Sequence, residues 1–117
     1  MGVEKGDDYA MNNLGALYEK KKKYDLAEKY FLMAIENGNI SSMHNLGVLH
    51  EEMKKYDLAE KYYLMAVENG DIVSMYNLGE MYKNNLKDNK KAKEFYSKAA
   101  AKGIKEADKA LKDMNKK

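Results

Sequence analysis

The chain has 117 residues, a net charge of +2, 44% apolar and 34% charged side chains, as expected for one folded domain or one short repeat array. So small a net charge gives no indication that the partner is a nucleic acid or an acidic substrate. The absence of cysteine excludes disulfides, thiolate metal sites and thiol catalysis.

The sequence also lacks the apolar segments that direct a chain into or across a membrane. No apolar run approaches the roughly 18 residues of a membrane span. The N-terminus has no apolar block of the kind found in signal peptides. We therefore expect an intracellular, cytoplasmic protein.

The first segment of the chain resembles the end of a helix. Val3–Asp7, "VEKGD", matches Val67–Asp71, "VENGD", at four of five positions, and there a helical pattern stops at a glycine. We interpret residues 3–6 as the remnant of a preceding repeat. The helix that follows should then expose apolar surface on the side where a neighbouring helix is missing.

An internal repeat accounts for most of the remaining sequence. "YDLAEKYFLMAIENG" begins at Tyr24 and "YDLAEKYYLMAVENG" at Tyr56, an offset of 32 residues with only two differences. "MNNLG", "MHNLG" and "MYNLG" begin at Met11, Met43 and Met75 with the same offset. A diverged third copy, "KKAKEFYSKAAAKG", spans 90–103. The repeat predicts units over approximately 7–38, 39–70 and 71–103.

Each unit is expected to form two amphipathic helices. In the first unit, apolar residues recur with the 3.6-residue period of a helix. They are Met11, Leu14, Leu17 and Tyr18 in the first helix, and Ala27, Tyr30, Phe31, Ala34 and Ile35 in the second.

Polar residues and glycines mark where the expected helices begin and end. Asp7, Asn39 and Asp71 follow glycines and can cap the next helix. The glycines that end helices suit a left-handed turn; they are Gly6, Gly38, Gly70 and Gly103. Gly15, Gly47 and Gly79 lie inside helices at a cost of roughly 1 kcal/mol each, so we expect them to let the second helix approach closely.

The last segment, 104–115, reads as a seventh amphipathic helix. Ile104, Ala107, Leu111 and Met114 share one face, whereas the lysines lie elsewhere. We expect it to cap the array by closing the last apolar face.

The repeated positions resemble the signature of the tetratricopeptide repeat, and the variant is similar to the Sel-one-like repeat. The matching sets are Met11, Leu14, Gly15, Tyr18, Ala27, Phe31 and Ala34; Met43, Leu46, Gly47, His50, Ala59, Tyr63 and Ala66; and Met75, Leu78, Gly79, Tyr82, Ala92, Tyr96 and Ala99. Short lysine-rich links replace the glycine-rich loop usual in the Sel-one-like family. The resemblance implies an all-α fold, a right-handed α-solenoid of antiparallel helix pairs with three repeats and a C-terminal capping helix.

The resemblance also implies a binding surface, because the first helices of such arrays line a concave groove. The groove-facing positions would be Asn12, Ala16, Glu19, Ser41, His44, Val48, Glu51, Val73, Tyr76, Glu80 and Lys83. They vary between units while the scaffold repeats, which either drift or selection for a ligand would produce. The asparagine that carboxylate-clamping members carry after the helix glycine is replaced by Ala16, Val48 and Glu80. An acidic groove favours a basic or neutral peptide.

No catalytic or metal-binding arrangement is recognisable. His44 and His50 lie about 240° apart on one helix and cannot share a metal. We interpret His50 as a packed substitute for the tyrosine at Tyr18 and Tyr82. No serine has a base beside it, and no phosphate-binding loop exists. We expect no enzyme activity, no cofactor and no metal.

Two further surfaces are worth weighing. Lysines gather on the expected inter-helix links, where they could form a basic rim that attracts nucleic acid or an anionic membrane, although a solubilising rim is the simpler interpretation. They are Lys20 to Lys23, Lys54, Lys55, Lys87, Lys90 and Lys91. Leu26, Met33, Leu58 and Met65 flank the core stripe; we expect them to pack against the next unit, or, if exposed, to support self-association.

These observations predict a non-enzymatic scaffold or adaptor that binds a protein or peptide in the groove of the array. The alternatives are a structural segment that self-associates, including through its uncapped N-terminal end, and a basic-rim binder of nucleic acid or anionic membrane.

Overall fold

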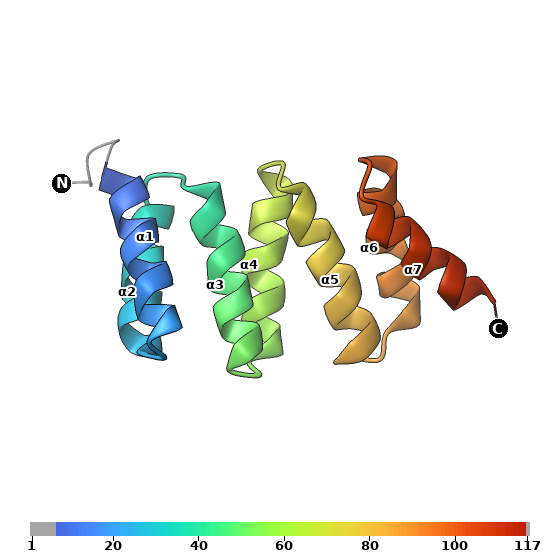
Figure 1. Cartoon of the computed structure of the whole chain (residues 1–117), viewed down its shortest axis with the longest axis horizontal. Coiled ribbons are helices and arrows are strands. Elements are labelled where there is room, and N and C mark those ends of the chain that lie inside the picture. The colour runs from blue at the N-terminus through green and yellow to red at the C-terminus, as the bar shows by residue number, and fades with distance from the viewer. Residues whose placement is uncertain (1–6, 117) are drawn as a thin grey trace. The chain divides into compact units, whose positions relative to one another are not determined.

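The computed structural model describes residues 7–116, and every regular element in that range is an α-helix (Figure 1). The all-α class is therefore confirmed. The expected remnant at residues 3–6 lies outside the described residues.

The chain divides into two compact units, which we call the N-terminal unit, ending at Asn69, and the C-terminal unit, beginning at Gly70. The N-terminal unit holds α1 (Asp7–Lys20), α2 (Tyr24–Ile35), α3 (Ile40–Glu52) and α4 (Tyr56–Glu68). The C-terminal unit holds α5 (Ile72–Asn84), α6 (Asn89–Ala101) and α7 (Lys105–Asn115).

Consecutive helices pack as pairs. In the N-terminal unit α1 lies against α2, α3 lies against α4, and α2 also packs on α3 (Figure 1). In the C-terminal unit α6 packs against both α5 and α7. Short links force these neighbours to run antiparallel.

The core of the N-terminal unit forms where α2 meets α3. Ala27 and Phe31 of α2 and Leu46 and Leu49 of α3 are fully buried. Tyr18, Tyr24, Ile35, Met53 and Tyr62 pack around them, half-buried. The buried residues lie at the helical spacing that the sequence predicted for the apolar stripes.

A glycine in the first helix of each pair receives an aromatic ring from the second helix. A Cβ placed on Gly47 would lie 2.6 Å from the Tyr63 ring, far inside van der Waals contact. The same holds for Gly15 against Phe31, at 2.5 Å, and for Gly79 against Tyr96, at 2.7 Å. The expected close approach at these three glycines is therefore confirmed.

Two of the three predicted N-terminal helix caps are present. The Asn39 side chain accepts a hydrogen bond from Ser42 N at 2.8 Å, and Asp71 accepts one from Ser74 N at 3.1 Å. Asp7, however, lies within α1 rather than before it. The cap of α6 is Asp88, which accepts from Lys91 N at 3.1 Å and which the repeat pattern did not indicate.

The links within the helix pairs contain lysines in a backbone conformation that side chains rarely adopt. Lys22, Lys54 and Lys87 have φ angles of 62°, 61° and 55°. A non-glycine residue in this left-handed region costs roughly 1–2 kcal/mol, so these links carry strain that a glycine would relieve. The expectation that all the clustered lysines lie on links was wrong for Lys20, which ends α1, and for Lys90 and Lys91, which begin α6.

The α1 helix exposes apolar surface that its counterpart buries. Leu17 of α1 is 46% exposed, whereas Leu49, at the same position of the repeat in α3, is fully buried by the preceding helix α2. The exposed apolar surface expected for the first helix is thus confirmed.

The second helices keep apolar side chains on their outer side. Leu26 of α2 and Leu58 of α4 are each 37% exposed, although Met33 and Met65 are half-buried. This set was expected to pack against the next unit, and the two leucines are covered only in part.

Candidate peptide-binding surface

In the N-terminal unit, the residues expected to face a groove lie on α1 and α3, which also contact each other. We call this set the α1/α3 face; it consists of Asn12, Ala16, Glu19, Ser41, His44, Val48 and Glu51. Ala16 and Ser41 are exposed and the other five are half-buried. Their spacing of three, four and seven residues places them along one side of each helix.

A network of polar side chains ties α1 to α3 behind this face. Asn12 Oδ1 accepts hydrogen bonds from Ser42 Oγ at 2.6 Å and from Asn45 Nδ2 at 3.0 Å. Nearby, Asn39 Nδ2 donates to Asp8 Oδ2 at 2.8 Å. The Asn12 side-chain oxygen therefore links α1 to α3, and it is not freely available to a ligand.

Sequence reasoning missed this network, although a signal for it was present. Asn45 recurs as Asn13 and Asn77, and Ser42 recurs as Ser74, at identical positions of the repeat. A polar residue that recurs at a helix position beside the core usually forms a hydrogen bond with a buried polar group. The recurrence of Ser42 and Asn45 therefore indicated that they form such hydrogen bonds.

His44 and Glu51 are both positioned by the buried ring of Tyr63. The His44 ring lies 5.9 Å from the Tyr63 ring, centre to centre, at a tilt of 58°. The Tyr63 hydroxyl donates to Glu51 Oε1 at 2.7 Å. Because Tyr63 is itself locked against Gly47, its ring fixes an imidazole and a carboxylate at the α1/α3 face.

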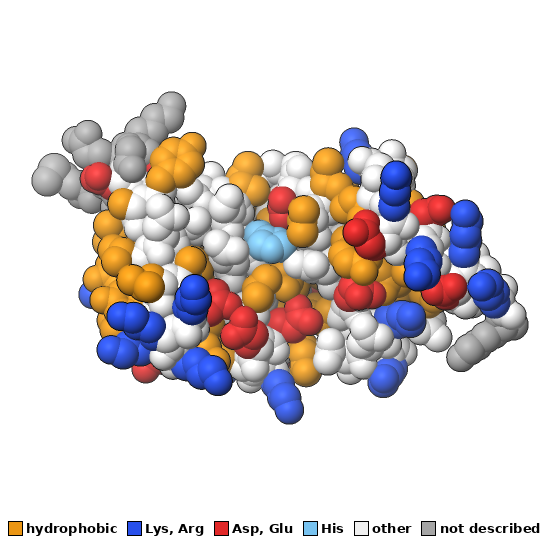
Figure 2. Space-filling view, in the orientation of Figure 1, with side chains coloured by type: hydrophobic (Ala, Val, Ile, Leu, Met, Phe, Trp, Pro, Cys, Tyr) orange, Lys and Arg blue, Asp and Glu red, His pale blue; other side chains and the backbone are white. Residues whose placement is uncertain are grey.

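Acidic side chains gather at the end of this face, over the lower part of α3 (Figure 2). Burial, with a hydrogen bond and a repulsive charge from Glu52, raises the pKa of Glu19 to about 8. Glu19 is therefore mostly protonated at neutral pH. The face is less negative than the count of its carboxyl groups suggested.

In the C-terminal unit, Glu80 of α5 joins two tyrosines. It accepts a short hydrogen bond from the Tyr96 hydroxyl of α6 and one of 3.2 Å from the Tyr76 hydroxyl. The two rings lie 5.9 Å apart with a tilt of 48°. Tyr76 thus stands on a buried tyrosine as His44 does, and burial, followed by the charge of Glu80, raises its pKa.

The other two expected residues of this unit lie at opposite ends of α5. Val73 is 52% exposed. Lys83 lines a pocket of about 390 Å³ together with Asn89, Lys93, Asp113 and Met114. Lys83 therefore lies beside α6 and α7, two helical turns from Tyr76 along the same side of α5.

His50 has no part in a site and is packed, as expected from its place in the repeat. It is 1% exposed and its ring stacks on Tyr62 at 5.6 Å, as Tyr18 stacks on Tyr30 at 5.6 Å. Its Nε2 lies 3.2 Å from Glu28 Oε2. Within residues 7–116 neither ring nitrogen has a well-aligned hydrogen-bond partner. Burial lowers the pKa of His50, and the opposing charge of Glu28 offsets this only in part.

We expect His50 to make the protein less stable as the pH falls. Below its ordinary pKa of about 6.5 the unfolded chain binds a proton that the folded chain does not, so the free energy of unfolding decreases by up to about 1.4 kcal/mol per pH unit. His50→Tyr, which installs the residue found at Tyr18 and Tyr82, should remove this contribution. Urea titrations from about pH 7 to about pH 5 measure the difference; parallel stability curves for the two proteins would contradict the expectation.

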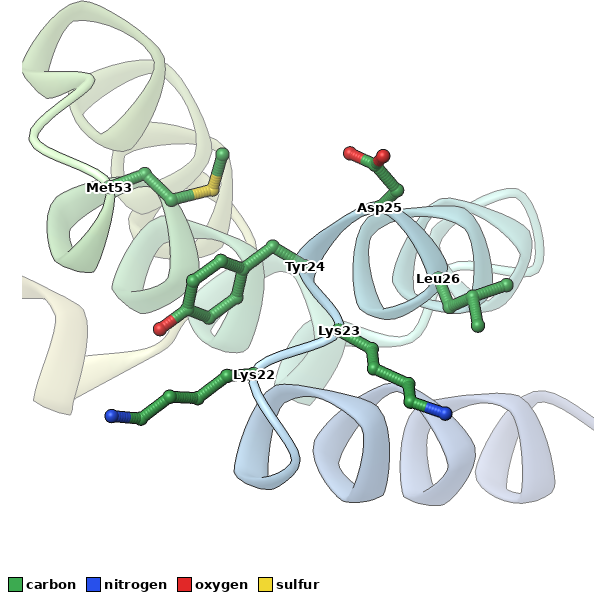
Figure 3. A pocket seen from close by; sticks show the side chains of 6 residues that line it. All are labelled: Lys22, Lys23, Tyr24, Asp25, Leu26 and Met53. Carbon is green, nitrogen blue, oxygen red and sulfur yellow. The ribbon is translucent and has the colours of Figure 1, made fainter.

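The lysines of the first link border a pocket of about 510 Å³ at the start of α2, lined by Lys22, Lys23, Tyr24, Asp25, Leu26 and Met53. Figure 3 shows the Tyr24 ring between Lys22 and Met53, while Lys22 and Lys23 point away from each other. The two ammonium groups do not converge on one point, and Asp25 adds a carboxylate to the same rim. This geometry favours the solubilising interpretation of the lysines.

Two kinds of site are absent from the described part of the chain. Residues 7–116 contain no group of three or more histidine and acidic side chains that could hold a metal ion. No helix in the same range is long and apolar enough to cross a membrane.

Comparison with known proteins decides the family. The tetratricopeptide repeat model matches residues 9–36 and 40–68, and the Sel1 repeat model matches residues 72–104. The chain belongs to the tetratricopeptide and Sel1-like helical repeat proteins. Repeats of this kind generally serve as scaffolds for protein interactions, and they are typically not enzymes.

Solved structures agree with this assignment. A Sel1 repeat protein from Oxalobacter formigenes is 29% identical, with a TM-score of 0.66, over 92% of this chain and 90% of that one. The N-terminal domain of stress-induced protein-1 from C. elegans has a TM-score of 0.87 over 99% of this chain and 100% of that one. At 21% identity, this second likeness concerns the fold alone. None of the curated proteins matches the sequence.

Proposed function

We propose that this helical repeat protein is an adaptor that binds a protein or peptide through the first helices of its pairs. In the N-terminal unit the binding residues are those of the α1/α3 face, and in the C-terminal unit they are Val73, Tyr76, Glu80 and Lys83. The single observation that carries the proposal is the contrast between repeated scaffold positions and varied positions on these helices.

The positions of His44 and Tyr76 support the proposal. They occupy the same place in the repeat, where the first unit has Asn12, and each ring rests on a buried tyrosine of the following helix. A planar side chain held on a rigid support loses little conformational entropy on binding. An imidazole and a phenol also offer both stacking and hydrogen bonds to a peptide.

The carboxylates of the proposed binding surface favour a basic or neutral peptide as the partner. Glu51 and Glu80 are held by the hydroxyls of Tyr63 and Tyr96, which leaves each glutamate with lone pairs for a further donor. A lysine or arginine of a partner would supply such a donor.

Affinity selection from a random peptide library displayed on phage tests the proposal. We expect the chain to enrich peptides with basic side chains, and we expect His44→Ala combined with Tyr76→Phe to weaken their binding at least about tenfold, equivalent to about 1.4 kcal/mol. Both changes keep the buried tyrosines and the helix glycines. Circular dichroism confirms that the variant is folded.

A matched control uses the outer side of the same unit. Leu26→Ala combined with Leu58→Ala alters two exposed leucines of the second helices and should leave peptide binding unchanged. The proposal fails if no peptide is enriched over background, or if the control weakens binding as much as the His44 and Tyr76 changes do.

Self-association is a second candidate function, favoured by the exposed Leu17 of α1. It requires a molar mass that rises with concentration in light scattering and returns to that of the monomer after Leu17→Glu.

A further inference from the structure

All three helices of the C-terminal unit line one polar pocket of about 390 Å³, which we call the α5–α7 pocket. Its lining consists of Lys83 of α5, Asn89 and Lys93 of α6, and Asp113 and Met114 of α7. Short links make consecutive helices antiparallel, so α5 and α7 run in the same direction and α6 packs against both. The pocket therefore lies where the last turns of α5 and α7 meet the first two turns of α6.

The two lysines of the α5–α7 pocket have no carboxylate partner. In the part of the chain that the structure describes, neither ammonium group lies within ion-pair distance of an acidic side chain. Asp113, the carboxylate among the described lining residues, already pairs with Lys116 at 3.7 Å. The described lining therefore carries more positive than negative charge, and a ligand group with one negative charge would balance it.

A carboxylate suits this lining better than a phosphate group does. A phosphate would bring nearly two negative charges close to Asp113, and the chain contains no arginine, whose planar fork matches phosphate oxygens. A carboxylate brings one charge, and the Asn89 amide can donate a hydrogen bond to one of its oxygens. Met114 adds an apolar wall for the methylene groups of an acidic side chain.

The charge on this side of the unit changes sign along α5. Burial, then the charge and hydrogen bond of Glu80, and lastly the charge of Glu106 raise the pKa of Tyr76, so Glu106 of α7 lies near Tyr76. Glu80 accepts hydrogen bonds from Tyr96 and Tyr76 and forms no ion pair with Lys83, one turn further on. A peptide that contacts both ends would therefore present a basic side chain to the glutamates and an acidic group to the lysines.

We propose that the α5–α7 pocket binds a carboxylate of the partner peptide, so that the partner carries an acidic group in addition to its basic residues. This inference rests on the proposed function, since it adds a second determinant of specificity to the same surface. It also gives α7 a role beyond closing the array, because the last turn of α7 forms one wall of the pocket.

The peptides enriched from the phage library provide the first test. We expect their aligned sequences to share an acidic position as well as basic ones. A synthetic peptide of the consensus sequence is then compared with a version in which the acidic residue is replaced by its amide. This change should weaken binding about fivefold, the upper end of the range for an exposed ion pair. Amidating the C-terminus of the same peptide tests the terminal carboxylate as the alternative source.

Variants of the pocket assign the effect to its residues. Lys83→Met combined with Lys93→Met removes both charges at nearly constant side-chain length, and it should abolish the difference between the acidic peptide and its amide. Asp113→Asn should enlarge that difference, because it removes the carboxylate that repels the ligand. Lys98→Met is the matched control: it removes the same charge from α6, but at a lysine that lies 3.3 Å from Glu94, and the difference should remain.

The outcomes separate this inference from the proposed function. If no peptide is enriched, both fail. If peptides are enriched but binding depends on no carboxylate, the inference is overturned and the proposed function stands. A carboxylate dependence that survives the double lysine variant, or that Lys98→Met removes equally, would also overturn it. Circular dichroism confirms that each variant is folded.

Discussion

Leu49→Ala is expected to lower the free energy of unfolding by about 3 kcal/mol, within the range for large-to-small changes in a packed core. Leu49 is fully buried where α2 meets α3, so the change removes apolar burial and leaves a cavity. Leu17→Ala, at the same position of the repeat in α1, should cost less than about 1 kcal/mol because Leu17 is already 46% exposed.

Leu17 and Leu49 form a controlled comparison, because they are the same residue type at the same position of the repeat. Each lies two residues after the glycine of its helix. Urea unfolding followed by circular dichroism gives both values. Equal losses would mean that α1 is covered in solution and would contradict the exposed face of this helix. A Leu17 loss that appears only at high protein concentration would favour self-association through that face.

Gly47→Ala is expected to destabilise the protein by about 2 kcal/mol, the middle of the range for overpacking. Alanine is the better helix former by roughly 1 kcal/mol, so propensity alone predicts the opposite sign. The added methyl would lie 2.6 Å from the ring of Tyr63, which is 1% exposed and hydrogen-bonded to Glu51, and so has no room to retreat.

A second substitution separates this clash from a general effect on the helix. In a Tyr63→Leu background the ring is gone, and Gly47→Ala should cost much less than in the natural chain. Asn13→Ala, at an exposed position of α1, serves as the control for propensity and should be neutral or slightly stabilising. A loss at Gly47 that is the same in both backgrounds would show that the ring is not its cause.

The helices could be predicted from the periodicity of the apolar residues. The role of the helix glycines could be predicted because a residue that destabilises a helix and still recurs in every repeat must serve packing. Gly47, unfavourable in a helix, recurs as Gly15 and Gly79, and the reason is an aromatic ring seated on each. His50 was likewise placed correctly, since Tyr18 and Tyr82, at the same position of the repeat, also pack their rings on a ring of the second helix. Periodicity and repetition are local properties of the chain, and they can be read without coordinates.

The electrostatics of the candidate surface could not be read in this way. Glu80 binds Tyr96 of a different helix, and the raised pKa of Glu19 depends on how closely Glu52 of α3 approaches it. Both depend on distances between helices, which the repeat pattern does not encode. The partial exposure of Leu26 could not be read for the same reason, because its apolar character indicates burial only if a neighbour is present to cover it.

The measurement that tests the proposed function most directly is a map of amide chemical-shift changes as a peptide enriched from the phage library is added to the isotope-labelled chain. We expect the largest changes on α1, α3 and α5, around Asn12, His44 and Tyr76. Changes confined to the outer side of α2 and α4, around Leu26 and Leu58, or to the lysine links, would contradict it.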